Sequence, residues 1–333
     1  MNSMEQTNLA TVRTTAFVRA ILVSCAAVCV PALGVMAQSA GVRSSSVTPV
    51  TGSTVSSASP ARGTLFIVGG GTQPHDLVVQ FVALAGGPGH ARIAILPMAS
   101  EESAQSGREK AEELRGLGAD AFVVDVTRSQ ADADSVVRLI RSATGIWFPG
   151  GDQARLTAHL QGSATLRAVH EKYRDGAVIG GTSAGAAVMS DSMLTGNQFF
   201  PGMATAADSG NSFRRIGRNT IEIVPGFGFL HNAIVDQHFI KRQRENRLIS
   251  VILERPSFIG VGIDEGTALR VYPDGHWEVL GASAAIVFDA RRATVTPSNA
   301  PKLGVMGLRV SVLPAGSTFD PRTGDATLPH TQR

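Results

Sequence analysis

Residues 178–190, VIGGTSAGAAVMS, constrain the fold of this chain more than any other stretch. An apolar run enters a glycine-rich bend and a run of small residues leaves it, which predicts a strand, a sharp turn and a helix. Ser183 lies at the apex, within the pattern G-x-S-x-G, whose glycines permit a strained turn. Such a turn exposes the serine oxygen near a helix N-terminus, where backbone amides stabilise a developing oxyanion. The pattern alone does not establish a nucleophile, because packing also produces small-residue turns.

Continuous apolar runs alternate with segments of helical periodicity from residue 64 to residue 182. Strands are predicted at 64–68, 92–97, 121–126, 145–148 and 177–179, and helices at 76–84, 103–117, 134–142, 154–161 and 164–174. This alternation predicts a three-layer, doubly wound α/β fold with a mostly parallel sheet. Ligands bind at the carboxyl ends of the strands in such sheets. Glycine clusters at 69–71, 150–151 and 180–185 follow strands, so we expect them at that edge.

The first glycine cluster does not indicate a nucleotide site. Residues 69–71 lack the G-x-G-x-x-G spacing, because Pro74 interrupts it, and no Walker lysine follows any glycine cluster. We therefore expect no cofactor. We also expect no metal, since His75, His90 and His231 show no ligand spacing with one another or with carboxylates.

The second half of the chain has a different pattern. Residues 194–218 are polar and glycine-rich, as in a mobile loop that covers a site or a plain surface excursion. A helix carrying Arg242, Arg244 and Arg247 is predicted after a strand at 233–235. Further strands are predicted at 259–263, in the hairpin region 269–288, and at 308–313. The last of these make up a small C-terminal β extension.

Residues 1–37 have the pattern of a signal peptide. Arg13 and Arg19 precede an apolar segment that ends in a small-x-Ala pattern, so we predict cleavage after Ala37 and a secreted or periplasmic protein. A membrane anchor is the alternative, but the apolar segment is short for spanning a bilayer. Lipidation at Cys25 is a weaker alternative.

Beyond Ala37 the chain divides by composition. Residues 38–62 are rich in Ser, Thr and Pro with almost no charge, as in a disordered linker, and we expect one folded domain at 63–320 and a flexible tail at 321–333. Both cysteines lie in the predicted signal peptide, so the mature protein would have no disulfide. The formal charge of +3 falls to +2 after cleavage, since two arginines and one glutamate are removed. This small charge argues against nucleic acid or a membrane surface as a partner.

A serine nucleophile needs a base within hydrogen-bond reach and a carboxylate that orients the base. His238 follows the strand at 233–235, and Glu265 follows the strand at 259–263, which we expect in the same sheet. We predict Ser183 as nucleophile, His238 as base and Glu265 as orienting acid, although Asp264 could take the place of Glu265. The amides of Gly150, Gly151 and Ala184 are the candidate oxyanion donors.

Several stretches resemble the signatures of the cyanophycinases, relatives of the dipeptidase E-like serine peptidases. They are residues 148–153 (FPGGDQ), 181–186 (GTSAGA), 236–239 (DQHF) with the arginines that follow, and 262–265 (GIDE). The resemblance runs from about residue 64 to about residue 320. It implies a class I glutamine amidotransferase-like (flavodoxin-like) fold and a Ser-His-Glu peptidase, in which Ser183, His238 and Glu265 match the catalytic positions.

The resemblance also implies a substrate and its binding residues. Cyanophycin is a poly-aspartate with an arginine on each side-chain carboxyl, and its hydrolysis releases β-Asp-Arg dipeptides. Residues matching the substrate pocket are Gln153, Asp236, Gln237, Arg242, Arg244 and Arg247. Arginines there can pair with substrate carboxylates, while an acid such as Asp236 can hold a guanidinium. The arginines do not share one helical face, so at least one is expected to be a solvated structural charge. A homodimer is expected only by resemblance.

The sequence departs from the cyanophycinase pattern in two places. Pro149 stands where cyanophycinases more often have threonine, and residues 196–218 have no counterpart that can be placed. Substrate specificity could reside in the second of these. The export signal favours an external polymer over an internal store as the substrate.

Three other functions fit parts of the sequence. A peptidase with the same triad could act on isoaspartyl or α-aspartyl peptides. An α/β-hydrolase esterase would use the order Ser183, then Asp236 or Asp264, then His276, although His276 lies in a predicted hairpin turn. A non-enzymatic binding protein would make Ser183 and His238 dispensable, and their joint presence argues against it.

Overall fold

The computed structural model describes residues 63–199 and 215–329. The predicted signal peptide (1–37), the predicted linker (38–62) and residues 200–214 of the predicted polar loop lie outside the described residues, as do residues 330–333.

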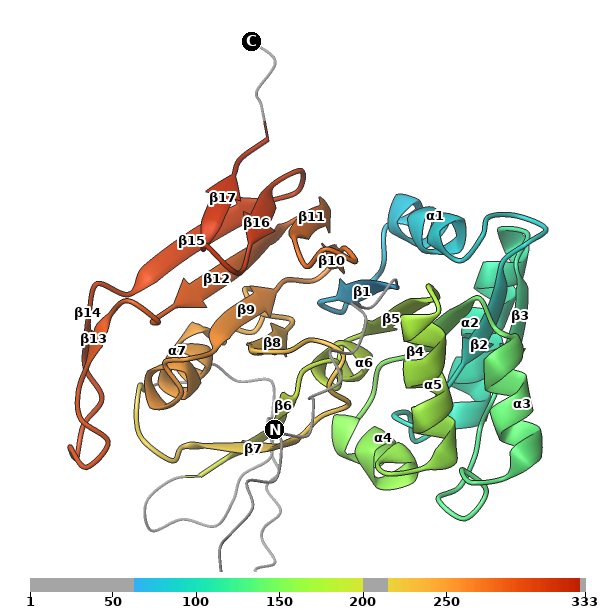
Figure 1. Ribbon diagram of the computed structural model, residues 1–333, viewed down its shortest axis with the longest axis horizontal. Coiled ribbons are helices and arrows are strands. Elements are labelled where there is room, and N and C mark those ends of the chain that lie inside the picture. Colours follow the sequence, from blue (N-terminus) through green and yellow to red (C-terminus); the bar gives the residue numbers. More distant parts are fainter. Residues whose placement is uncertain (1–62, 200–214, 330–333) are drawn as a thin grey trace, which may run out of the picture. The chain divides into compact units, whose positions relative to one another are not determined.

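Parallel strands form one half of a nine-stranded central sheet (Figure 1). They are β1 (Thr64–Val68), β2 (Arg92–Ile95), β3 (Asp120–Val123), β4 (Gly145–Phe148) and β5 (Val178–Thr182), in the spatial order β1-β5-β4-β2-β3. Their apolar side chains are buried on both faces of the sheet, as expected for parallel strands, except that Phe122 and Val123 of the edge strand β3 are partly exposed. The predicted strands are confirmed, with small differences at their ends.

Helices cover both faces of this parallel half. They are α1 (His75–Leu84), α2 (Ser103–Gly116), α3 (Asp134–Ser142), α4 (Gln153–Leu160) and α5 (Ala164–Arg174). Along β1, Leu65 and Ile67 belong to the buried cluster that contains residues of α3, α4 and α5, whereas Phe66 and Val68 belong to the cluster of α1 and α2. Because successive side chains of a strand point to opposite faces, the two helix groups lie on opposite sides of the sheet. The predicted three-layer arrangement is therefore present in this half.

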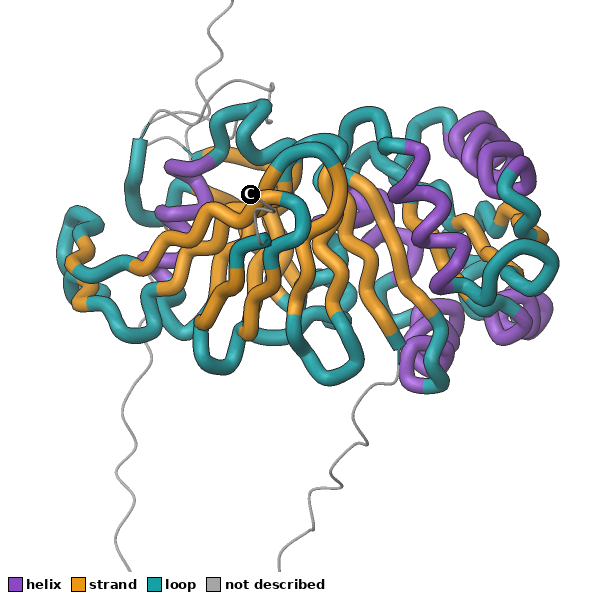
Figure 2. The backbone as a smooth tube through the Cα atoms, turned by 90° about the horizontal axis from the view of Figure 1, so that it is seen from above, coloured by secondary structure: helices purple, strands orange, loops and turns teal. Residues whose placement is uncertain are grey.

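Antiparallel strands form the other half of the same sheet. They are β10 (Thr267–Val271), β11 (Trp277–Gly281), β16 (Thr318–Asp320) and β17 (Asp325–Thr327), which continue from β1 (Figure 2). The complete sheet is thus mixed. The prediction of a flexible tail from residue 321 is wrong for the described residues, since β17 pairs with β16 at the edge of the sheet.

A separate four-stranded sheet contains the strands that precede His238 and Glu265. Its strands are β8 (Ala233–Gln237), β9 (Ile259–Ile263), β12 (Ala284–Asp289) and β15 (Arg309–Pro314), in the order β15-β12-β9-β8. β8 and β9 are parallel and are joined by α7 (Glu245–Glu254), which packs its apolar side chains onto this sheet. The expectation that these strands belong to the sheet of Ser183 is therefore wrong.

The predicted arginine-bearing helix is shorter than the sequence suggested. α7 begins at Glu245, so Arg242 and Arg244 lie in the turn before it and Arg247 alone is helical. The backbone at His238 (φ 48°) and Gln243 (φ 50°) is left-handed, which is incompatible with a continuous helix after β8.

Short paired strands complete the structure. β6 (Ser192–Gln198) pairs with β7 (Ile221–Pro225), and β13 (Thr294–Val295) pairs with β14 (Val305–Met306), while α6 (Ala184–Ala187) follows β5. The predicted polar loop thus starts as a strand in which Leu194 is buried. Within the described ranges, every helix is too short or too polar to span a bilayer.

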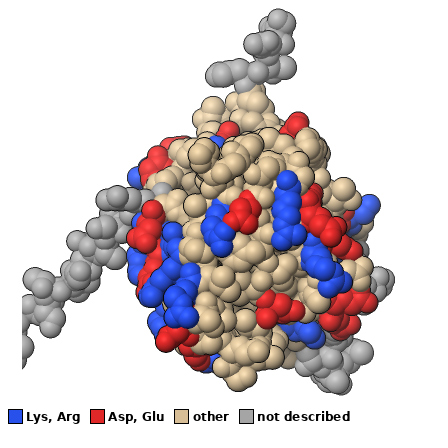
Figure 3. All heavy atoms as spheres, turned by 90° about the vertical axis from the view of Figure 1, so that its right-hand side faces the viewer, with Lys and Arg blue, Asp and Glu red and all other residues tan. Residues whose placement is uncertain are grey.

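Charges of both signs are intermixed on the face that carries β3 and α3 (Figure 3). Ion pairs there include Arg92 with Asp120, Arg128 with Asp132 at 2.8 Å, and Arg141 with Glu171 at 3.0 Å. Their side chains are largely solvent-exposed, so each pair contributes little to stability.

Candidate active site

Ser183 lies at a strained turn between β5 and α6. Its backbone has φ 54° and ψ −110°, and its amide donates to Val68 O at 3.1 Å, which ties the turn to the end of β1. A Cβ on Gly181 would lie 2.5 Å from Gly185 O, and a Cβ on Gly185 would overlap Phe148 O. The glycines of G-x-S-x-G are therefore required by the close approach of β5, α6 and β4.

The structure brings Ser183, His238 and Glu265 into one hydrogen-bonded chain. His238 Nε2 lies 2.9 Å from Ser183 Oγ, and His238 Nδ1 lies 2.6 Å from Glu265 Oε1. Both distances are within hydrogen-bond range, and they join a hydroxyl, an imidazole and a carboxylate in the order of a catalytic triad. The nucleophile candidate comes from the parallel sheet, while the other two residues come from the ends of β8 and β9.

Asp264 and His276 lie elsewhere. Asp264 accepts hydrogen bonds from the Lys241 amide at 2.9 Å and from Ser283 Oγ at 2.8 Å. His276 contacts Asp274 and stacks on the ring of Tyr272, with 4.0 Å between ring centroids. Glu265 thus takes the position beside His238, and the triad that an esterase would need is not assembled among the described residues.

The glycines after β1 make room for His238 and Glu265, a role that the sequence did not reveal. Gly70 has φ 109°, and a Cβ there would overlap the imidazole ring of His238. Gly71 has φ 69°, and a Cβ there would lie 2.8 Å from Glu265 Cβ. In addition, Gly69 O accepts a 2.6 Å hydrogen bond from the His238 amide. This cluster therefore shapes the site by its lack of side chains.

Burial lowers the pKa of His238 below its ordinary value of 6.5. The hydrogen bond to Glu265 acts in the opposite direction, and the positive charges of Arg242 and Arg244 lower the pKa further. His238 is consequently neutral near pH 7, and a neutral imidazole can accept a proton from a serine hydroxyl.

The turn that carries Gly150 and Gly151, two of the predicted oxyanion donors, passes close to Ser183, and the third, Ala184, follows Ser183 directly in the chain. A Cβ on Gly150 would lie 3.4 Å from Ser183 Cβ, so the turn after β4 runs alongside the hydroxyl. Gly151 has φ 138°, and its position against Ala99 O leaves no space for a side chain. The amides of this turn remain candidate donors to an oxyanion.

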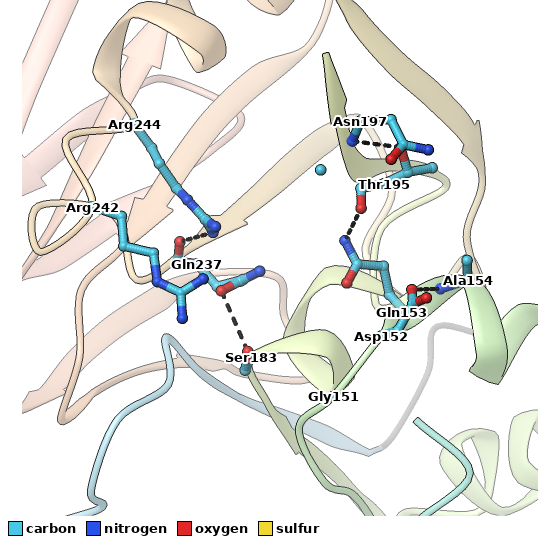
Figure 4. Close-up of a pocket in the computed structure, with 11 residues that line it drawn as sticks. Gly151, Asp152, Gln153, Ala154, Ser183, Thr195, Asn197, Gln237, Arg242 and Arg244 are labelled. Carbon is cyan, nitrogen blue, oxygen red and sulfur yellow. Dashed lines mark hydrogen bonds between the residues drawn. The ribbon is translucent and has the colours of Figure 1, made fainter. Parts of the chain in front are cut away.

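A pocket of about 430 Å³ opens beside Ser183, and we call it the Ser183 pocket (Figure 4). Arg242 and Arg244 lie on one side of it, and Asp152 and Asn197 lie on the other. Gln237 lies near the centre, with its side-chain Oε1 3.4 Å from Ser183 Oγ. The pocket thus offers positive charge on one side, and a carboxylate and neutral polar groups on the other.

Strand β6 supplies the far wall of the Ser183 pocket, in a region where the sequence predicted either a loop that covers a site or a plain surface excursion. Gln153 is buried and donates to the carbonyl oxygens of Leu194 at 2.8 Å and Thr195 at 2.7 Å. Thr195 and Asn197 both donate to Glu222 Oε2, at 2.8 and 2.7 Å. Their alternate positions, which place both side chains on one face of a strand, were the available sequence signal.

Asp236 and Arg247 lie behind the Ser183 pocket, contrary to the expectation that they line it. Both are buried, and Arg247 donates to Asp236 through Nε at 2.7 Å and through Nη2 at 2.5 Å. Asp236 Oδ1 also accepts from the Gln237 amide at 2.8 Å, while Arg244 Nη1 donates to Gln237 O at 2.6 Å. Asp236 thus holds a guanidinium of the protein itself. Arg247 is a structural charge, but a buried one.

No group of three or more His, Cys, Asp or Glu side chains in the described residues could hold a metal ion. The groups that the arrangement brings together are a serine hydroxyl, an imidazole and a carboxylate.

Comparison with known proteins places the chain among peptidases. Residues 65–278 match the family model described as peptidase family S51. Cyanophycinases from Synechococcus elongatus and from Thermosynechococcus vestitus (strain NIES-2133 / IAM M-273 / BP-1) are each 33% identical over 273 residues, which cover 79% of this chain and 80% of the relative. A cyanophycinase from Nostoc sp. (strain PCC 7120 / SAG 25.82 / UTEX 2576) is 32% identical over 242 residues, covering 70% and 76%.

A solved structure has the same fold. It is the crystal structure of a peptidase from an acI-B1 Actinobacterium, with 22% sequence identity, a TM-score of 0.56, and coverage of 78% of this chain and 98% of that chain.

Proposed function

Because the chain belongs to peptidase family S51 and is a serine-type peptidase, we propose that it hydrolyses cyanophycin to β-Asp-Arg dipeptides, as an exopeptidase. The observation that carries this proposal is the hydrogen-bonded chain from Ser183 through His238 to Glu265 beside an arginine-lined pocket. The sequence identity to several cyanophycinases over most of their length supports the choice of substrate.

The proposed reaction proceeds through an acyl-enzyme. Ser183 Oγ attacks the scissile carbonyl carbon while His238 Nε2 takes the hydroxyl proton, and the amides of Gly150, Gly151 and Ala184 stabilise the oxyanion. The C–N bond then breaks, and His238 returns the proton to the leaving amine. A water molecule attacks the resulting ester, giving one proton to His238. When the ester bond breaks, His238 passes that proton to Ser183 Oγ, and the acid product leaves.

The remaining residues have supporting roles in this proposal. Glu265 holds the His238 ring and stabilises the imidazolium that forms. Arg242 pairs with a carboxylate of the substrate, and Gln153, Gln237 and Arg244 shape the Ser183 pocket. Asp236 and Arg247 fix the end of β8 from behind.

The wider setting is proposed on the sequence pattern and the resemblance. We propose a class I glutamine amidotransferase-like fold with a C-terminal β extension, on the grounds that β5, α6 and the Ser183 turn form a strand-elbow-helix unit. We also propose export after cleavage at Ala37, and a homodimer. Isoaspartyl and α-aspartyl peptides are the alternative substrates of the same triad.

Product analysis tests the proposed function. The wild-type protein and a Ser183→Ala variant are incubated with cyanophycin, with isoaspartyl and α-aspartyl peptides, and with a p-nitrophenyl ester. We expect β-Asp-Arg from cyanophycin with the wild type alone. Hydrolysis of the aspartyl peptides without hydrolysis of cyanophycin would instead select the alternative substrates. Ester turnover that survives in His238→Ala would contradict the proposed triad.

A further inference from the structure

A second cavity, of about 500 Å³, lies on the other side of the Ser183 turn. We call it the Lys110 cavity. Its lining includes Glu109, Lys110 and Glu113 of α2, Trp147 of β4, Gly150, and Thr182 of β5. Gly150 and Thr182 are the chain neighbours of Gly151 and Ser183, which line the Ser183 pocket. The two cavities therefore flank the same turn, where the scissile bond of a peptide would lie.

Two polar groups of the Lys110 cavity are buried without a partner. The indole nitrogen of Trp147 and the hydroxyl of Thr182 have no hydrogen-bond partner among the described residues. Trp147 is only 2% exposed. A buried donor without an acceptor costs free energy, so an acceptor from a ligand would stabilise both groups.

Lys110 adds a positive charge to these donors. Its ammonium lies 4.6 Å from the centroid of the Trp147 ring and donates to Gln73 Oε1 at 3.0 Å and to Glu113 Oε2 at 2.5 Å. An ammonium has three N–H donors, so one remains for a ligand. The Lys110 side chain is 9% exposed, which makes a hydrogen bond from it stronger than one in water.

The rim of the Lys110 cavity has the opposite chemistry. Glu109 is exposed, and the Glu113 side chain is 45% exposed. The inner groups thus present donors and a positive charge, while the rim presents carboxylates. This pairing fits a ligand with a carboxylate at one end and a cationic group at the other.

We propose that the Lys110 cavity binds the residue on the leaving side of the scissile bond, through the free α-carboxylate and the guanidinium of its arginine. The carboxylate accepts from Lys110, Trp147 and Thr182, and the guanidinium lies against Glu109 and Glu113. This inference rests on the proposed function, because an arginine joined through its α-amine to an aspartate side chain keeps both groups. The Ser183 pocket then holds the unit on the acyl side.

A defined substrate pair tests the inference. One substrate is a synthetic dimer of β-Asp-Arg units joined by a single α-peptide bond. The other is the same dimer with a carboxamide in place of the arginyl carboxylate of the leaving unit alone. For the wild type we expect kcat/KM to be about tenfold lower on the amide, mainly through KM, since a charge-assisted hydrogen bond is lost.

Variants of the Lys110 cavity should remove this discrimination. Lys110→Gln is expected to lower kcat/KM on the unmodified dimer about tenfold and to cleave both dimers equally well. Thr182→Val keeps the side-chain shape and provides a milder test if Lys110→Gln does not fold, with roughly a threefold loss of the preference. Lys302→Gln, at an exposed lysine, is the matched control and should behave as the wild type.

The outcomes separate this inference from the proposed function. If the wild type cleaves both dimers with equal kcat/KM, the Lys110 cavity does not bind the carboxylate, while the proposed function stands. Wild-type discrimination that is retained in both Lys110→Gln and Thr182→Val would place the carboxylate elsewhere and would also overturn the inference. If the wild type cleaves neither dimer nor the polymer, both proposals fail together.

Discussion

The parallel half of the central sheet and the four-stranded sheet contribute to the candidate active site by different means. At the end of β5, Ser183 is held by backbone geometry: a left-handed φ, glycines on either side and a hydrogen bond to Val68 O. At the ends of β8 and β9, His238 and Glu265 lie among charges that include a buried Asp236–Arg247 ion pair. Backbone geometry in the parallel half therefore positions the reacting groups, including the His238 ring through the glycines after β1, whereas charge in the four-stranded sheet tunes the base.

This difference predicts two kinds of mutational effect. A substitution in the glycine-shaped turns should change the distances between reacting groups, with a strong effect on rate. A substitution in the charged region should change protonation or folding stability as well. Four sets of variants test this contrast.

The largest expected effect is the loss of the base. His238→Ala should lower kcat/KM on cyanophycin by about 10⁴-fold or more, because Ser183 then lacks a proton acceptor. The measurement is the rate of β-Asp-Arg release by the purified proteins. His276→Ala, in the β10–β11 turn, is the control and should keep wild-type activity. A near-normal rate in His238→Ala would show that the four-stranded sheet does not supply the base.

The next effect concerns stability. Asp236→Asn removes one partner of a fully buried ion pair and leaves Arg247 uncompensated, so the free energy of unfolding should fall by about 3–5 kcal/mol. Urea denaturation followed by circular dichroism measures it. Asp132→Asn, in the exposed pair with Arg128, should leave the midpoint nearly unchanged. Equal midpoints for the two variants would mean that charge does not stabilise the end of β8.

A glycine substitution in the loop after β1 tests the role of backbone geometry. Gly70→Ala places a methyl group where the His238 ring lies, so kcat should fall by about 100-fold as the ring is displaced. Gly87→Ala has a comparable backbone strain, with φ 81°, but no atom within 4 Å of the added Cβ. It should cost about 1 kcal/mol of stability and leave kcat unchanged. If both variants retain full activity, the loop after β1 is not what positions His238.

The smallest expected effect is a shift of the pH profile. Protonated His238 cannot accept the Ser183 proton, so kcat/KM should fall as the pH drops below the pKa of His238, which burial lowers from its ordinary value. Arg242→Gln removes a positive charge that lowers this pKa. The pKa of His238 then rises, and the acid limb should move to higher pH. KM should also increase about tenfold.

The control for this shift is Arg138→Gln, at an exposed arginine of α3, for which the acid limb should stay in place. A shift of the Arg242→Gln profile to lower pH would contradict the proposed coupling between Arg242 and His238.

The parallel half of the fold was predictable because its signals are local. Buried parallel strands read as continuous apolar runs, and the strand-turn-helix pattern around Ser183 depends on glycines that are neighbours in sequence. The charged half was less predictable because its signals are long-range. The sequence shows where β8 and β9 end but not which strands they pair with, so it cannot show that they form a second sheet.

Asp236 and Arg247 are a second case in which a long-range contact could not be predicted from the sequence. Both residues carry charge near predicted strand ends, which suggests substrate contact. Only the left-handed turns at His238 and Gln243, and the late start of α7, direct Arg247 toward Asp236 and away from the Ser183 pocket. Conversely, Lys110 and Trp147 gave no sequence signal, because α2 and β4 meet only through the packing of a helix on the sheet.

The loop after β1 has a consequence for the evolution of such proteins. Gly69 accepts a hydrogen bond from the His238 amide through its carbonyl oxygen, and Gly70 leaves room for the His238 ring because it has no side chain. One nucleotide change that adds a methyl group there can therefore strongly reduce catalysis without removing the nucleophile or the Ser183 pocket. A descendant altered in this way would still be able to bind the proposed substrate in the Ser183 pocket. A binding protein with little catalytic activity is therefore one mutational step from this enzyme, and its sequence would retain Ser183, His238 and Glu265.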